Sequence, residues 1–158
     1  MKRLLLSLLL TMPLTLTAGE NPAAAVQASV LQRHDSPLSV SQTASALRTQ
    51  LESRGITVFA LIDHAAAAEK AGLSMPPTQV LVFGNPRGGT PLMLAHPDLA
   101  LDLPVRVLIR QNHAGKTEVL WRSPAALAAA QGLPADALSG LQALDILLRG
   151  LLQEIAGK

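Results

Sequence analysis

The apolar residues of this 158-residue chain follow two patterns, short continuous runs and helical spacing. Residues 56–62 are a β-rich run that is apolar on both faces, which predicts an interior β-strand, and residues 79–83 predict another buried strand. After Ser39, apolar residues recur at helical spacing, and Gln42 three positions later completes a capping box. A helix is therefore expected to begin there and to end at Gly55, because a left-handed glycine often closes a helix.

The rest of the pattern predicts further helices and a hairpin. Thr90-Pro91 and Ser123-Pro124 are typical of helix starts, and Asp63 is expected to cap the alanine-rich run that follows it. This order predicts an α+β fold, a two-layer sandwich of about five mixed or antiparallel strands with helices mainly on one face. The other expected elements are a first strand at 26–34, hairpin strands at 105–111 and 117–122, and a long amphipathic helix from Leu138 to Ile155.

The N-terminus has the form of a secretory signal. Lys2 and Arg3 precede an apolar stretch from 4 to 16, which is too short for a membrane anchor of about 20 residues. We expect cleavage after Ala18, although a pattern of small residues permits a site as late as residue 25. The protein is therefore expected to be periplasmic or secreted, without a stable membrane anchor after cleavage.

Composition narrows the class of partner. The precursor carries 13 Lys and Arg against 11 Asp and Glu, and removal of Lys2 and Arg3 leaves the two signs balanced. Because nucleic-acid binding requires a dense basic face, nucleic acid is not an expected partner. There is no cysteine, which excludes disulfides, a thiolate nucleophile and cysteine zinc ligands. The mature chain is expected to form one domain at 26–133, with an amphipathic helix at 134–158 that packs on it or on a dimer partner.

Contiguous strings of specific residues lie between Asp63 and Pro104. They are Asp63-His64, Pro76-Pro77-Thr78-Gln79-Val80, Phe83-Gly84-Asn85-Pro86, Gly89-Thr90-Pro91-Leu92-Met93 and Leu101-Asp102-Leu103-Pro104. On these strings, the chain from about Ala44 to Trp121 resembles the domain of unknown function 302 family. The resemblance implies a compact α+β fold, export as a single domain, a homodimer and no settled activity. Trp121 stands where the family commonly has tyrosine, and Ala130-Gln131 where it often has Arg-His, so mechanisms that need those residues are not expected here.

We interpret the chain as a non-catalytic module that binds a small ligand or a protein partner through segments 63–64, 83–91 and 101–104. Strand ends and helix starts gather at one rim in such folds, so these segments are expected to converge there. No catalytic residue, metal ligand or cofactor is assigned. The candidate ligand-binding residues are Asp63, His64, Phe83, Gly84, Asn85, Arg87, Gly89, Thr90, Met93 and Asp102.

The segment from Gly84 to Thr90 is the most distinctive of these. Its backbone N–H groups offer a site for a small anion or carboxylate, with Arg87 assisting. It is not a nucleotide loop, because Thr90 stands where a P-loop requires lysine and Pro91 where it requires Ser or Thr. The simpler interpretation is a tight turn that depends on its glycines.

Two alternatives remain open. One is a small enzyme in which His64 is the acid or base and Asp102 or Asp63 orients it. The other is a periplasmic metal-handling protein that uses His64, His96 and methionine, although no short-range ligand spacing is present. The last helix is also either packed within the chain or a surface for self-association.

Overall fold

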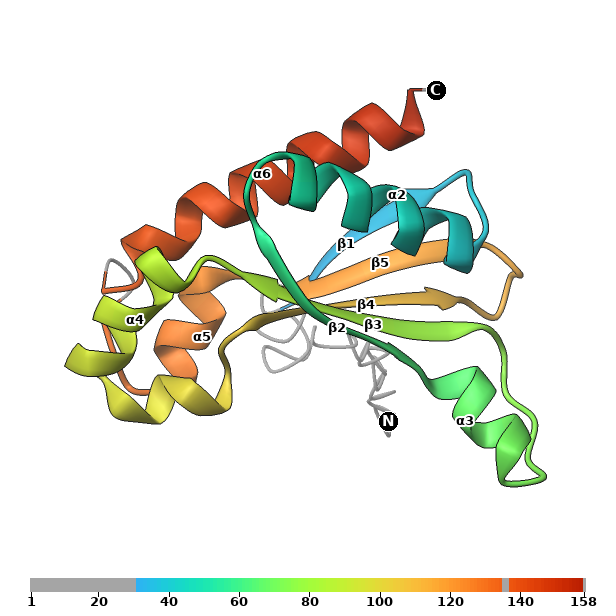
Figure 1. The fold of residues 1–158 in the computed structure, drawn as a ribbon, viewed down its shortest axis with the longest axis horizontal. Helices are drawn as coiled ribbons and strands as arrows, with labels where there is room; N and C mark the ends of the chain where they lie inside the picture. Colours follow the sequence, from blue (N-terminus) through green and yellow to red (C-terminus); the bar gives the residue numbers. More distant parts are fainter. Residues whose placement is uncertain (1–30, 135–136, 158) are drawn as a thin grey trace, which may run out of the picture.

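The computed structural model describes residues 31–134 and 137–157, which form one five-stranded antiparallel sheet with helices around it (Figure 1). The predicted signal segment and residues 26–30 of the predicted first strand lie outside this range. In the sheet the strands are ordered β1-β5-β4-β3-β2, and every neighbouring pair is antiparallel. The strands are β1 (Leu31–Ser36), β2 (Thr57–Asp63), β3 (Thr78–Gly84), β4 (Val105–Gln111) and β5 (Thr117–Arg122).

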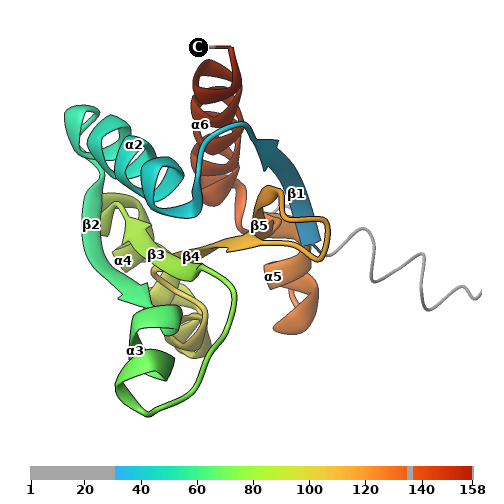
Figure 2. The same cartoon turned by 90° about the vertical axis from the view of Figure 1, so that its right-hand side faces the viewer.

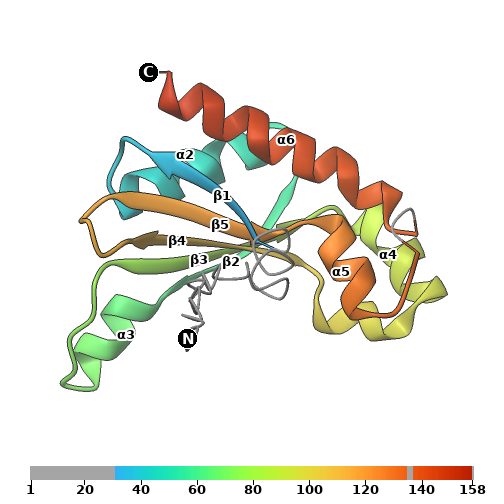
Figure 3. The ribbon, with the colours of Figure 1, turned by 180° about the vertical axis from the view of Figure 1, so that it is seen from behind.

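Two long helices cover one face of the sheet (Figure 2). They are α2 and α6, and α6 crosses above β1 towards the end where α4 and α5 lie (Figure 3). The short helix α3 projects from the other end of the sheet. The predicted α+β class with helices mainly on one face is confirmed. The helices are α2 (Val40–Ser53), α3 (His64–Lys70), α4 (Pro86–Ala95), the 3₁₀ helix η1 (Pro97–Leu101), α5 (Pro124–Ala130) and α6 (Ser139–Ala156).

The local signals at α2 behave as the sequence predicts. The Ser39 side chain accepts a hydrogen bond from the Gln42 backbone N–H, and the Gln42 side chain accepts one from the Ser39 backbone N–H. Gly55 follows the helix with φ of 72°, a conformation that glycine adopts without strain. Capping at both ends therefore defines where this helix begins and ends.

The main core lies between the sheet and the two covering helices. Leu81, Phe83 and Ile109 project from the strands and are fully buried against Leu47 of α2 and Leu151 of α6. Helix α6 is therefore packed within the chain along its apolar stripe. A second cluster joins η1, α5 and the start of α6 through Leu99, Leu103, Leu127, Ala128, Leu138 and Leu141.

The strand β2 differs from its prediction. The sequence predicts an interior strand, whereas among the described strands β2 pairs with β3 alone and forms one edge of the sheet. The pairing contains an irregularity between Val58 and Ala60. Large apolar side chains, including Leu61 and Ile62, are exposed on this edge. The apolar run therefore marks an unpaired edge rather than a central position.

Candidate functional site

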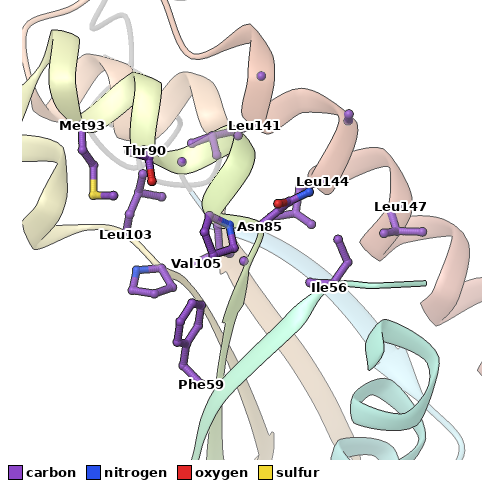
Figure 4. A pocket seen from close by; sticks show the side chains of 17 residues that line it. Ile56, Phe59, Asn85, Thr90, Met93, Leu103, Val105, Leu141, Leu144 and Leu147 are labelled. Atoms are coloured by element: carbon purple, nitrogen blue, oxygen red, sulfur yellow. The ribbon is translucent and has the colours of Figure 1, made fainter. Parts of the chain in front are cut away.

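An apolar groove lies where the end of β3, the start of β4 and helices α4 and α6 meet (Figure 4). Its volume is about 460 Å³. Figure 4 shows Met93 and Leu103 at one end of the groove and Ile56 and Leu147 at the other, with Phe59 on the strand side. None of the described residues that line it is charged, and Asn85 and Thr90 supply its polar side chains.

Helix α4 forms one wall of the groove and begins earlier than predicted. Asn85 is its N-cap and Pro86 its first residue, so Thr90-Pro91 lies inside the helix rather than at its start. The Asn85 Oδ1 accepts a hydrogen bond from the Arg87 backbone N–H at 3.0 Å. The Asn85 carbonyl accepts from Gly88 N–H at 3.0 Å and from Gly89 N–H at 2.8 Å. The helix start thus satisfies its own donors, and the predicted cradle of free N–H groups for an anion is wrong.

The glycines of this segment do not serve a tight turn. Gly84, Gly88 and Gly89 are absent from the glycines with positive φ, which in the described residues are Gly55, Gly72, Gly115 and Gly132. A Cβ added at Gly88 or Gly89 would meet no atom within 4 Å. Glycine inside a helix costs about 1 kcal/mol relative to alanine. Neither backbone conformation nor crowding accounts for that cost, whereas both residues line the groove and keep its wall free of side chains.

Five of the predicted site residues come together at this groove. Gly84, Asn85, Gly89, Thr90 and Met93 all line it, together with Leu103 and Pro104 from the predicted segment 101–104. Two other predicted residues lie nearby without lining it. The side chain of Phe83 is fully buried in the main core, and Arg87 is exposed on α4.

Asp63 and His64 lie elsewhere. Asp63 pairs with Gln79 at one end of the β2–β3 ladder, whereas Gly84 pairs with Thr57 at the other end. A strand rise of about 3.4 Å per residue separates the two ends by about 17 Å. The predicted convergence of segment 63–64 with the other two segments is therefore wrong, whereas residues from both 83–91 and 101–104 lie together at the groove.

The Asp63 carboxylate has a structural role at its own position. Its Oδ1 accepts from the Ala66 N–H at 2.9 Å, which confirms the predicted helix cap, and its Oδ2 accepts from Gln79 Nε2 at 2.8 Å. The bond from Ala66, followed by the bond from Gln79, lowers the pKa of Asp63 below its ordinary value. His64 is the exposed first residue of α3.

Two pairings that the alternatives use, His64 with Asp102 and His64 with His96, are not formed. The Asp102 Oδ2 accepts from Gln131 Nε2 at 2.8 Å at the end of η1, while His64 begins α3 beyond the opposite end of the sheet (Figure 1). The predicted His64–Asp102 pair is therefore wrong. His96 ends α4 and does not lie with His64 either. Within residues 31–134 and 137–157, no group of three or more His, Asp or Glu side chains is placed to hold a metal ion.

A family model described as "Domain of unknown function DUF302" matches residues 32–151. The chain belongs to this family. The matched range contains every residue that lines the groove. A DUF302 protein from Bacillus stearothermophilus, described as an uncharacterized conserved protein, has the same fold with a TM-score of 0.70 and 18% sequence identity, over 80% of this chain and 98% of that one.

Curated relatives of this DUF302 chain are longer proteins. The protein named fluoride-specific ion channel FluC 1 of Brucella suis is 39% identical over 107 residues, which are 68% of this chain and 42% of the relative. FluC 2 of Brucella melitensis is also 39% identical, over 68% of this chain and 40% of its own length. The chain thus spans less than half of the curated relatives it matches. In the described part of this chain, no helix has both the length and the apolar character needed to span a bilayer.

Sequence reasoning missed the far wall of the DUF302 groove. Ile56 just before β2, Phe59 on β2, and Leu141, Leu144 and Leu147 on α6 line it, and none was a predicted site residue. The apolar stripe of α6 predicts a buried face but does not distinguish leucines that fill the core from leucines that border a groove. The helical glycines at 88, 89 and 140 were the one available signal, because glycine is costly in a helix.

Proposed function

We propose that this DUF302 chain is a non-catalytic exported module that holds an uncharged, mainly apolar small molecule in the groove between α4 and α6. The observation that carries the proposal is the groove itself, with a volume of about 460 Å³ and no charged residue among its described lining. Ligand sites commonly have volumes of about 300–1,000 Å³ with apolar walls and few polar groups. Export is supported by the signal-like residues 1–18.

The residues that form the walls of the groove support a ligand-binding role rather than a purely structural one. Three helical glycines, Gly88, Gly89 and Gly140, line the groove where larger side chains would fill it. A Cβ at Gly140 would lie 3.9 Å from the Leu92 Cδ1, an ordinary contact, so crowding does not require glycine there. The groove is open to solvent, and a contiguous apolar hollow on a protein surface often marks a binding site. Binding an apolar ligand accounts for both the hollow and the glycines.

The first experiment measures binding of Nile red, an uncharged apolar dye, by its fluorescence. We expect saturable binding to the unaltered chain and at least roughly tenfold weaker binding to Gly89→Leu, whose side chain enters the open space of the groove. Gly150→Leu is the matched control. It makes the same change in α6 at a glycine that does not line the groove, and a Cβ added there would also meet no atom within 4 Å.

Equal dye binding by all three proteins would contradict the groove as the binding site. Loss of binding in Gly150→Leu as well would show a general effect on α6 instead. Native mass spectrometry of the purified chain then identifies any molecule retained by the unaltered protein and absent from Gly89→Leu.

A second proposal concerns a protein partner. The Brucella relatives carry the matched region inside longer chains named fluoride-specific ion channels. We propose that this region of the present chain acts beside a membrane ion channel of the kind for which the relatives are named. The test is co-expression of the tagged chain with the Brucella suis relative shortened by its matched region, followed by purification in mild detergent. Recovery no greater than that of an unrelated membrane protein would contradict this proposal.

A further inference from the structure

We propose that the groove ligand is an acyl chain and that the α4–η1 end of the molecule contacts the lipid surface that supplies it. This inference rests on the proposed function and adds to it both the class of ligand and its source. Its starting point is the composition of the groove. Because no described lining residue is charged, the buried part of a ligand must be uncharged as well, since an unpaired buried charge is costly.

The polar side chains in the groove can donate hydrogen bonds to one uncharged acceptor group of a ligand. The Asn85 Oδ1 already accepts from Arg87 N–H, which leaves the amide NH₂ as the donor that Asn85 can offer to a ligand. The Thr90 hydroxyl, on the next turn of α4, is the second polar group of the groove. An ester carbonyl is an acceptor without charge, and the hydrocarbon on either side of it matches the apolar ends near Met93 and Leu147. An esterified acyl chain therefore satisfies both the polar and the apolar parts of the lining.

The surface beside one end of the groove is exposed and apolar. Met93 and Leu103 line that end, and Leu94 on α4 and Leu101 on η1 have exposed fractions of 79% and 74%. Scattered exposed leucines are ordinary on a protein surface. These two have the highest exposed fractions among the large apolar residues of the described chain, and both belong to the α4–η1 end, on the left of Figure 1. Their position favours contact with the medium from which an apolar ligand enters.

The charges near this end favour binding to a lipid surface through burial of apolar side chains rather than through electrostatic attraction. Between Pro86 and Leu101, Arg87 and Asp98 are of opposite sign, and no run of basic residues is present. Arg106 is engaged with the Leu101 carbonyl at 2.8 Å, which holds the end of η1 in place. A segment of this kind lacks the basic cluster that recognises anionic lipid headgroups. Transfer should therefore depend little on the anionic lipid content of the membrane.

The chain contains a single tryptophan, which makes the transfer directly measurable. Trp121 lines a small cavity together with Val105, Leu141 and Leu144, and these three residues also line the groove. Trp121 is thus one layer of side chains from a bound ligand. The probe is an anthroyloxy-labelled fatty acyl methyl ester, which accepts energy from tryptophan. It is presented to the purified chain either in phosphatidylcholine vesicles or as a soluble cyclodextrin complex.

The decisive variant combines Leu94→Ser with Leu101→Ser. We expect transfer from vesicles to slow by about tenfold, because the apolar contact with the lipid surface is lost. Equilibrium binding of the probe from cyclodextrin should match that of the unaltered chain, because neither leucine lines the groove. The matched control combines Leu73→Ser with Ile146→Ser. Those residues are exposed to 68% and 69%, but they lie on other parts of the molecule, so the control should transfer at the unaltered rate.

The two levels of the proposal fail in different ways. If Nile red binds in the groove but the acyl ester does not, the ligand class is wrong while the proposed function stands. If the ester binds and both double variants transfer alike, the lipid contact is overturned. If neither probe binds in a manner sensitive to Gly89→Leu, the proposed function itself is contradicted.

Discussion

At the scale of single residues, Asp63 links local structure to pH. The hydrogen bonds from Ala66 and Gln79 stabilise its ionised form and hold its pKa below the ordinary value of 3.8. A carboxyl group whose pKa is lowered by folding contributes stability that is fully present above the unfolded value and is lost as the pH falls through the folded value. Asp63 therefore contributes to folding at neutral pH and ceases to do so in acid.

Asp63→Asn tests this contribution. Asparagine keeps an oxygen that can cap α3 but cannot be protonated in this range. We expect the melting temperature of the variant to be lower than that of the unaltered chain at pH 7. Below about pH 3.8, the difference should shrink as Asp63 is protonated. The measurement is circular dichroism melting across the acid range. A difference that stays constant with pH would contradict the role given to Asp63.

Glu118 is the second residue whose charge matters, and it is buried. Its side chain is 1% exposed and forms ion pairs with Arg33 from β1 and with Arg110 from β4, the latter at 2.6 Å. A buried carboxylate depends on its partners, because its own hydration has been lost. The two arginines are partly exposed, so they lose less than Glu118 does when the pairs are broken.

This asymmetry gives a double-variant prediction. Replacing both Arg33 and Arg110 by Met should lower the free energy of unfolding by about 3 kcal/mol, because a buried charge is left without a partner. Adding Glu118→Gln to that protein should restore part of the loss. The measurement is urea unfolding of all three proteins. If the added change destabilises the double variant further, Glu118 contributes through packing and hydrogen bonds rather than charge.

These two acids show what single positions reveal in a sequence. Asp63 precedes an alanine-rich run, so its role as a cap could be predicted from local spacing. The structural role of Glu118 was not predicted. The predicted hairpin does contain β4 and β5, and Arg110 on β4 pairs directly with Glu118 on β5. The contribution of Arg33 could not be found in this way, because β1 joins β5 from a distant part of the chain.

At the scale of elements, α4 was the least predictable part of the fold. Pro86 favours a helix start, but Gly88 and Gly89 favour a turn, and the local preferences of these residues conflict. Asn85 resolves the conflict by capping the first turn. The hairpin of β4 and β5 was predicted correctly because alternating strands and a short turn between them specify each other locally.

Two glycine-to-alanine substitutions should shift stability in opposite directions. Gly89→Ala should stabilise the chain by about 0.5–1 kcal/mol, because alanine favours helix and its Cβ meets no atom within 4 Å. Gly55→Ala should destabilise it by about 1 kcal/mol, because φ of 72° is strained for alanine. Urea unfolding measures both. Destabilisation by Gly89→Ala would show that glycine is needed there for the backbone and not for the groove.

At the scale of the whole molecule, the sequence did not reveal strand order. An apolar run such as β2 is compatible with a central strand and with an edge whose partner lies outside the chain. Because strand order and direction were not known from the sequence, Asp63 was predicted to lie near Gly84. The antiparallel pairing of β2 with β3 places these two residues at opposite ends of the ladder. The residues of segment 83–91 were grouped correctly, because β3 leads directly into α4.

The exposed edge bears on the predicted homodimer. Phe59, Leu61 and Ile62 are exposed on β2, and no charged residue interrupts the strand before Asp63. Native sheets usually protect an edge with charge, proline or a covering element. On β2, the irregularity between Val58 and Ala60 is the main feature that interrupts the regular edge. An antiparallel pairing of β2 with β2 of a second copy is symmetric and would extend the sheet across both chains.

We therefore propose that the dimer interface is formed by β2 rather than by α6. Introducing two lysines into β2 should then prevent dimerisation. The combined change Leu61→Lys and Ile62→Lys should convert a dimer to a monomer, because like charges would face each other across the symmetric pairing. Ile146→Lys on the exposed side of α6 is the control and should remain dimeric. Light scattering coupled to size exclusion measures the mass of each. A monomeric unaltered chain at high concentration would exclude the dimer, and a monomeric Ile146→Lys beside an unchanged β2 variant would move the interface to α6.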